Sequence, residues 1–218
     1  MTGSDFAFLN FLLKQHLLAG PVLELGGGYG GDTSKALMEQ AGFLYKSTDL
    51  KANLGVDIVA DFESGESMED VLAAGPFKSV LILNVLEHTF EPIKVLDHAL
   101  SALSSKGKLV VITPVLWPIH NYPIDCCRLL PDWYRRYAQS RKLIIQNESF
   151  CWIDDRYNKI TPVSISQTAD GQDNYPAIAA HRPFHRLWSR GIHKVLGTFG
   201  QSTAYPSHLT IGVVLEKN

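Results

Sequence analysis

The sequence VLELGGGYGG at residues 22–31 joins a strand-forming run to a glycine-rich turn, and helix-forming residues follow it. Glycine carries no Cβ and tolerates a positive φ, so the backbone of such a turn approaches a nucleotide-like ligand closely. The segment therefore predicts a strand, a turn and a helix that together bind a nucleoside cofactor.

The spacing of the glycines admits one familiar class of cofactor. Gly26, Gly28 and Gly31 match the dinucleotide-binding fingerprint. Asp49 lies near the distance at which that fold places an acid for a ribose hydroxyl. A nicotinamide-dependent oxidoreductase is therefore one interpretation of the turn.

Two further features favour a different nucleoside cofactor. Glu24 stands two residues before the first glycine, and a second strand-like run at residues 55–60 ends on Asp61. The segment ELGGGYG at residues 24–30 resembles the acid-x-Gly-x-Gly-x-Gly loop of the class I S-adenosylmethionine-dependent methyltransferases.

The resemblance continues downstream in the order typical of that family. The segment LILNVLEHT at residues 81–89 resembles the fourth strand and the Glu-His turn of its small-molecule, type 11-like branch. The segment SKGKLVVI at residues 105–112 resembles the glycine-containing turn into the fifth strand. Together these segments identify the chain as similar to that branch over roughly residues 20–130.

The resemblance also implies roles for single residues. It makes Asp49 the ribose-binding acid and Asp61 the adenine-binding acid. It gives Glu24 a role in ordering the glycine loop and the methionine amino end of the cofactor, and it places the backbone of Asn84 beside the methionyl group. The cofactor-binding residues implied for S-adenosylmethionine, whose product is S-adenosylhomocysteine, are Glu24, Gly26, Gly28, Gly30, Asp49, Asp61, Phe62 and Asn84.

The hydrophobic pattern predicts an α/β fold. Strand-like and amphipathic helical runs alternate, which implies right-handed βαβ units and a parallel sheet covered on both faces. The resemblance adds an antiparallel pair at the sheet edge, which gives a Rossmann-like, doubly wound, seven-stranded sheet, mostly parallel with an antiparallel last strand. The expected strands are 22–25, 43–48, 56–60, 79–84, 108–113, 142–150 and 209–215. The expected helices are 6–18, 31–41, 67–74, one opened by Glu91-Pro92 and one opened at Pro131. The helix opened by Glu91-Pro92 has Ile93, Leu96, Leu100 and Leu103 on its apolar stripe.

We expect one methyltransferase domain across the 218 residues. Its expected parts are an N-terminal helix at 1–20, a cofactor-binding core at 21–113, and an acceptor-side loop and helix at 114–141. An insertion at 151–207 precedes the last strand and is the expected place for substrate-specific structure.

Composition indicates which classes of binding partner and which cellular compartment to expect. Twenty basic and 22 acidic residues leave no net field for a polyanion, which argues against a nucleic-acid binder. The apolar run at residues 6–18 is too short to span a bilayer and lacks a basic leader, so no transmembrane or signal segment is expected. Three cysteines without C-x-x-C spacing predict a reduced, cytoplasmic protein without a structural metal.

Two histidines are candidates for the base that takes a proton from the acceptor. His88 lies in the Glu-His turn, and His120 lies in the proline- and aromatic-rich loop where an acceptor would bind, which makes His120 the preferred candidate. Trp117, Tyr122 and Arg128 in the same region are candidate acceptor-binding residues, with lid packing and a surface ion pair as the alternatives.

A basic strip lies in the expected insertion. Arg182, Arg186, Arg190 and Lys194 recur every four residues and share one face of a helix. An ordinary solvated face is one interpretation. The other is that Arg186 and Arg190 help to hold an anionic acceptor, such as a phosphorylated or nucleotide-linked sugar or a lipid-linked head group contacted at the membrane surface.

These observations predict methyl transfer from S-adenosylmethionine to a small or medium-sized acceptor, at a hydroxyl oxygen. The Asn/Asp-Pro-Pro-aromatic motif of exocyclic-amine methyltransferases is missing after the fourth strand, where Asn84-Val85-Leu86-Glu87 stands. The alternatives are a catalytically inactive protein that binds the cofactor as a partner of another enzyme, and the oxidoreductase named above.

Overall fold

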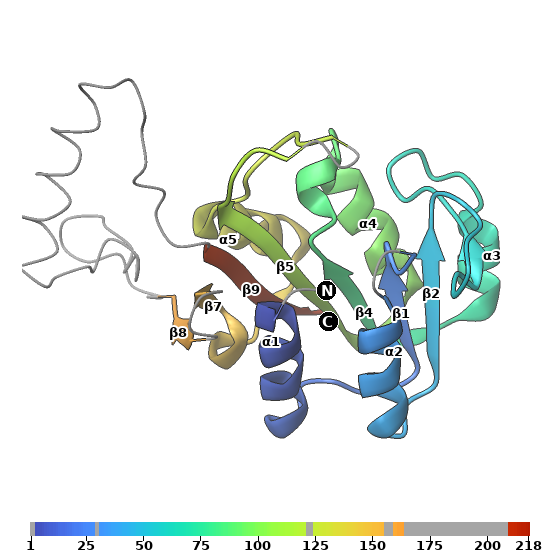
Figure 1. The fold of residues 1–218 in the computed structure, drawn as a ribbon, viewed down its shortest axis with the longest axis horizontal. Helices are drawn as coiled ribbons and strands as arrows, with labels where there is room; N and C mark the ends of the chain where they lie inside the picture. The colour runs from blue at the N-terminus through green and yellow to red at the C-terminus, as the bar shows by residue number, and fades with distance from the viewer. Residues whose placement is uncertain (1–2, 29–30, 121–123, 155–158, 164–208) are drawn as a thin grey trace, which may run out of the picture.

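The computed structural model describes residues 3–28, 31–120, 124–154, 159–163 and 209–218, and Figure 1 shows their arrangement. The helices are α1 (Gly3–Lys14), α2 (Gly31–Gln40), α3 (Met68–Ala74), α4 (Pro92–Ala102) and α5 (Pro131–Arg141), with short 3-10 turns η1 (Leu86–His88) and η2 (Asn147–Ser149). The strands are β1 (Val22–Leu25), β2 (Tyr45–Asp49), β3 (Ile58–Val59), β4 (Phe77–Leu83), β5 (Leu103–Leu116), β6 (Ile144–Ile145), β7 (Cys151–Asp154), β8 (Lys159–Pro162) and β9 (Leu209–Glu216).

All the described strands form one sheet. Their order is β3-β2-β1-β4-β5-β9-β7-β8, and β6 also pairs with β9. The first five strands are parallel, and β9 runs antiparallel to β5. The expected Rossmann-like sheet, mostly parallel with an antiparallel last strand, is confirmed.

The expected number of seven strands is wrong in detail, because β6 and β7 replace the predicted strand at 142–150 and β8 is additional, which gives nine strands among the described residues. The polar residues 146–148 interrupt it, yet pairing with β9 continues on both sides of the break. The hydroxyl of Ser149 accepts the amide proton of Val214 at 3.0 Å, so a side chain replaces a backbone acceptor across the gap.

Within the predicted insertion at 151–207, residues 151–154 and 159–162 form the antiparallel pair β7–β8. Cys151 pairs with Pro162 and Asp154 with Lys159, so this hairpin extends the sheet beyond β9. Residues 155–158 and 164–207 of the insertion lie outside the described residues.

Apolar side chains cover both faces of the sheet, as the doubly wound prediction requires. On one face, residues of α3, α4 and α5 pack with Leu23, Val80 and Val111. On the other, residues of α1 and α2 pack with Val22, Leu81 and further sheet residues. Figure 1 shows α1 and α2 together on one side of the strands.

The apolar stripe of α4 is shifted from its predicted position. Leu96 and Leu100 are buried as expected, whereas Ile93 is 47% exposed. The buried face is centred on Val95 and Leu96. Because successive side chains are about 100° apart around the helix axis, Ile93 points away from this face. Leu103 is buried but belongs to β5.

The parallel strands bring distant residues to one edge of the sheet. The carboxyl ends of β1, β2, β4 and β5 are followed by the glycine turn, Leu50, Asn84 and Trp117 respectively. Ligands of open α/β sheets bind at this edge. The fold therefore places the predicted cofactor and acceptor segments side by side.

Candidate active site

The glycine turn after β1 packs directly against the end of β2. Gly26 has a φ of +73°, a conformation that residues with a Cβ rarely adopt. The Gly27 amide donates to the Thr48 carbonyl at 3.1 Å, and the Gly28 amide donates to Oδ2 of Asp49 at 3.0 Å. A Cβ on Gly28 would lie 2.5 Å from that same oxygen, so only glycine fits there without a shift of the carboxylate.

Asp49 ends β2 with both carboxylate oxygens held. Oδ1 accepts the Leu50 amide proton at 2.7 Å, and Oδ2 accepts that of Gly28. Each oxygen has a further lone pair, so the side chain keeps the capacity to bind hydroxyl groups of a ligand. Gly30, predicted to bind the cofactor as well, lies outside the described residues.

Two buried acids lie beneath the ends of β1 and β4. Glu24 is buried in β1, and its Oε2 accepts the Tyr45 hydroxyl proton at 2.7 Å. Burial raises the pKa of Glu24, although hydrogen bonds from Ser34 and Tyr45 oppose this. Asp5 of α1 is fully buried, and both its carboxylate oxygens lie 3.0 Å from Nδ2 of Asn84, which holds Asn84 in place.

Asn84 is the residue at which the chain turns out of the sheet. It follows β4 with a φ of 54°, a left-handed conformation that asparagine adopts more readily than most residues. Its amide donates to the Ile112 carbonyl at 2.9 Å, which extends the pairing with β5 by one residue. Its side chain reaches α1, so helix and strand end are fixed to each other at the predicted methionyl position.

Asp61 closes its own turn. Its Oδ1 accepts the amide protons of Glu63 and Ser64 at 2.7 and 3.2 Å. Desolvation opposes ionisation here, but these hydrogen bonds keep the pKa of Asp61 below its ordinary value. The side chain of Phe62 is 5% exposed and belongs to the core, so the aromatic ring packs inside the domain and offers little surface to a ligand.

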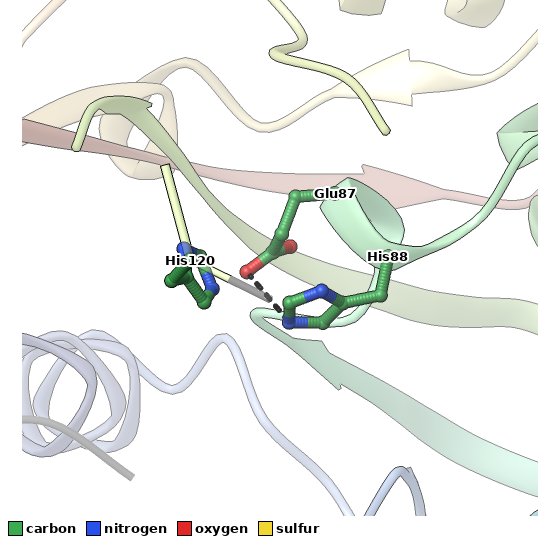
Figure 2. A group of neighbouring side chains, drawn as sticks. All are labelled: Glu87, His88 and His120. Carbon is green, nitrogen blue, oxygen red and sulfur yellow. Dashed lines mark ion pairs between the residues drawn. The ribbon is translucent and has the colours of Figure 1, made fainter. Parts of the chain in front are cut away.

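Glu87, His88 and His120 gather at the same edge, from η1 and from the loop after β5. Nε2 of His88 lies 3.8 Å from Oε1 of Glu87, and the two imidazole rings meet edge to face with their centres 5.0 Å apart. Figure 2 shows the Glu87 carboxylate directed toward the rings. Glu87 is 2% exposed, and burial raises the pKa of its carboxyl to about 8.

Both histidines are held through Nδ1. Nδ1 of His88 contacts the Ile124 carbonyl, and Nδ1 of His120 lies 3.4 Å from Oδ2 of Asp125. Arg128 binds the same Asp125 carboxylate with both terminal nitrogens, and this pairing lowers the pKa of Asp125 to about 2. Acceptors at Nδ1 place the ring proton there and leave Nε2 of each ring with its lone pair.

A pocket of about 560 Å³ opens beside the histidines, at the end of β5. Asp125 connects the two features, because it lines the pocket and contacts His120. The predicted residues Trp117 and Arg128 belong to the wall, whereas Tyr122 lies outside the described residues. The lining residues are Val115, Leu116, Trp117, Pro118, Ile119, Asp125, Cys126, Cys127 and Arg128.

Most of the predicted site residues therefore reach one edge, with some exceptions. Arg186 and Arg190 lie outside the described residues, so the basic strip has no position here. Sequence reasoning missed Asp5, Glu87 and Asp125 as parts of the site. The available indications were an acid beside an apolar run, the Glu of the Glu-His turn, and an acid three residues before Arg128.

The family model for the methyltransferase domain matches residues 6–160. The chain belongs to this family. It is an S-adenosylmethionine-dependent methyltransferase, and S-adenosylmethionine is its cofactor. The oxidoreductase interpretation is thereby set aside.

Solved structures share the fold of this methyltransferase at low identity. An S-adenosylmethionine-dependent methyltransferase from Archaeoglobus fulgidus superposes with a TM-score of 0.52 at 13% identity, covering 99% of this chain and 95% of that one. Phosphoethanolamine N-methyltransferase 2 of Haemonchus contortus, solved with phosphomonomethylethanolamine and S-adenosylhomocysteine, has a TM-score of 0.55 at 15% identity, with 99% of this chain but 53% of that chain covered. The CurJ carbon methyltransferase has a TM-score of 0.52 at 14% identity, with coverages of 96% and 53%.

These neighbours transfer methyl groups to different atoms, so the shared fold leaves the acceptor atom of this methyltransferase open. No curated protein sequence matches the chain. Among the described residues, none of the helices has the length and apolar character needed to cross a bilayer.

Proposed function

We propose that this methyltransferase transfers the methyl group of S-adenosylmethionine to a hydroxyl oxygen of a small or medium-sized acceptor bound in the pocket after β5. The observation that carries the proposal is the position of that pocket beside two histidines whose Nδ1 atoms are already engaged. A hydroxyl must lose its proton as it attacks, and a free Nε2 next to the acceptor is able to take it.

The residues around the glycine turn support the assignment of the cofactor-binding roles. Asp49 has oxygen lone pairs available for ribose hydroxyls beside the Gly28 amide. Asp5 and Glu24 are buried acids whose charges oppose each other's ionisation. S-adenosylmethionine brings a sulfonium and an ammonium group, and a cationic ligand near these acids offsets their repulsion.

The sulfonium is already activated, so alignment of the acceptor oxygen with the methyl group is the main task of the protein. Such alignment supplies about 7–11 kcal/mol in well-oriented systems. As the oxygen–carbon bond forms, the carbon–sulfur bond breaks, its electron pair returns to sulfur, and the hydroxyl proton passes to the base. We place this proton on His120, with His88 as the alternative, and we assign Trp117, Tyr122 and Arg128 to the acceptor side.

The chemistry of the acceptor is part of the same proposal. Asp125 holds the Arg128 guanidinium, so Arg128 is a weak anchor for an additional anion. An anionic acceptor, such as a phosphorylated or nucleotide-linked sugar or a lipid-linked head group, therefore depends on Arg186 and Arg190. We further propose one catalytic domain acting in the cytoplasm, where Cys126, Cys127 and Cys151 remain reduced thiols.

Incubation with isotope-labelled S-adenosylmethionine and a cell extract, followed by mass spectrometry, tests the proposal. We expect one class of small molecule to gain the label on oxygen. Replacing His120 by alanine should reduce turnover roughly 10²–10⁴-fold while the affinity for S-adenosylmethionine stays unchanged. His16→Ala, at an exposed histidine after α1, is the matched control.

Two results would contradict the proposal. A label found on nitrogen or carbon would refute O-methylation. The second result is that the protein binds S-adenosylmethionine but forms no labelled product with any of several different cell extracts. It would favour the alternative of a catalytically inactive partner protein.

A further inference from the structure

Glu87, His88 and His120 offer one ligand atom each, and these three atoms all lie within 4.8 Å of one another. Two imidazole nitrogens and one carboxylate oxygen are a common donor set for catalytic divalent ions such as Zn²⁺. Glu87 and His88 are neighbours in η1, whereas His120 lies in the loop after β5, so the fold brings His120 to the other two.

The contacts behind the histidines are those of metal ligands. A histidine that binds a metal usually donates its second ring N–H to a carbonyl or a carboxylate, which fixes its tautomer and orientation. His88 does so at the Ile124 carbonyl, and His120 at the Pro118 carbonyl 3.3 Å away, with the Asp125 carboxylate 3.4 Å from the same nitrogen. The outer contacts therefore prepare both rings to bind through Nε2.

Glu87 supplies the negative charge that the site needs. Its side chain is 2% exposed, and its Oε2 has no hydrogen-bond partner among the residues that the structure describes. A buried carboxylate without a partner is costly unless it is neutralised by a proton or a cation. The cation of Arg128 is already bound to Asp125, and Asp5 adds further negative charge nearby.

Two spacings within the group are close to those of ligands on one small ion. Two imidazoles on a tetrahedral ion with Zn–N bonds of about 2.0–2.1 Å have ring centres about 5 Å apart. The rings of His88 and His120 are 5.0 Å apart. Oε1 of Glu87 is 3.8 Å from Nε2 of His88, a few tenths of an ångström more than two ligands on such an ion require.

We propose that Glu87, His88 and His120 form a binding site for a divalent transition-metal ion, with Zn²⁺ as the probe that matches the donor set. Three protein ligands leave a coordination position open, as in catalytic zinc sites. Asp125 lines the pocket and contacts His120, so the group lies next to the region assigned to the acceptor.

The role of the ion, unlike its binding, rests on the function proposed above. An acceptor hydroxyl bound at the open position ionises more easily, and its proton passes to solvent because the histidine lone pairs are occupied. The oxygen then takes the methyl group as the carbon–sulfur bond breaks and S-adenosylhomocysteine forms. In this case His88 and His120 act as ligands, and the metal ion replaces the histidine base assigned above while the methyl transfer to oxygen stays the same.

Zinc binding can be measured without acceptor or turnover. The full chain is dialysed against a chelator, titrated with Zn²⁺ by calorimetry, and its retained metal is counted by mass spectrometry. We expect each wild-type chain to bind one zinc ion tightly. This binding should be lost in Glu87→Gln, His88→Ala and His120→Ala and kept in the control His16→Ala. Asp125→Asn, which changes the contact behind His120 and also the pairing with Arg128, should weaken zinc binding by roughly 10–100-fold.

Circular dichroism and affinity for S-adenosylmethionine show whether each variant is folded. His120 keeps the test decisive if Glu87→Gln fails to fold, because its side chain is 34% exposed on a loop. The proposal is overturned if the wild type retains no zinc, or if the His120 variant binds zinc as the wild type does. If the wild type binds zinc but its turnover is unchanged after the chelator removes the zinc, the metal site is upheld and its role in the reaction is refuted.

Discussion

Gly28→Ala is a small change with a defined effect on the cofactor site. The new Cβ would lie 2.5 Å from Oδ2 and 3.0 Å from Cγ of Asp49, so the carboxylate must move. That movement breaks the 3.0 Å hydrogen bond from the Gly28 amide and displaces the acid from its proposed ribose contact. Loss of a hydrogen bond to a charged group costs about 1.5–3 kcal/mol, which is roughly a 10–150-fold loss of affinity for S-adenosylmethionine.

Calorimetry of S-adenosylmethionine binding measures this loss, with Asp49→Ala as the reference for complete removal of the acid. Gly42→Ala is the control for a general loss of stability, because Gly42 has a φ of +80°, which alanine rarely adopts, and no atom lies within 4 Å of its Cβ. That control should lower stability and leave cofactor affinity unchanged. Wild-type affinity in a folded Gly28→Ala variant would refute the proposed ribose contact.

Three further predictions concern packing, charge and thiol reactivity. Gly212→Ala places a Cβ 2.6 Å from the ring of Phe8 in α1 and should lower the free energy of unfolding by about 1–3 kcal/mol. Chemical denaturation measures this loss, and an unchanged denaturation midpoint would contradict the packing of Phe8 on Gly212. The hydrogen bond from Arg141 lowers the pKa of Asp97, so the stabilisation from this pair is present above the unfolded pKa of Asp97 and is lost as the pH falls. Because the pair is exposed, Arg141→Met should lower the free energy of unfolding by less than about 1 kcal/mol at pH 7. Denaturation at a pH where Asp97 is protonated should show no difference between the variant and the wild type. Burial raises the pKa of Cys151 to about 12, so iodoacetamide should label exposed Cys126 in the native protein and Cys151 only after unfolding, as peptide mass spectrometry would show.

The parallel half of the fold was predictable from the sequence because its hydrophobic pattern and its turns agree. The predicted strand 79–84 contains the continuous apolar run 80–83, which is the pattern of a strand covered on both faces, and Pro92 opens the next helix as expected. The antiparallel half was less predictable. The break near Ser149 depends on a hydroxyl that pairs with Val214, and local sequence carries no record of such a distant partner.

The candidate site shows the same division. Asp49 and the glycine turn could be predicted because a short motif fixes both the backbone and the spacing. Asp5 could not, since an acid in the first turn of a helix is ordinarily exposed, and its contact with Asn84 joins residues far apart in the sequence. The grouping of Glu87 with His120 depends on how the loop after β5 returns to η1, which spacing alone does not determine.

The position of β9 sets the order in which this sheet can be completed during synthesis. β9 is the last described strand along the chain, yet it lies between β5 and β7 and also pairs with β6. Until residues 209–216 have left the ribosome, β5 keeps an open edge, and the β7–β8 hairpin has no strand to join it to the core. An unpaired edge is a template for association with other chains, so a product truncated before residue 209 should aggregate rather than fold into a smaller enzyme.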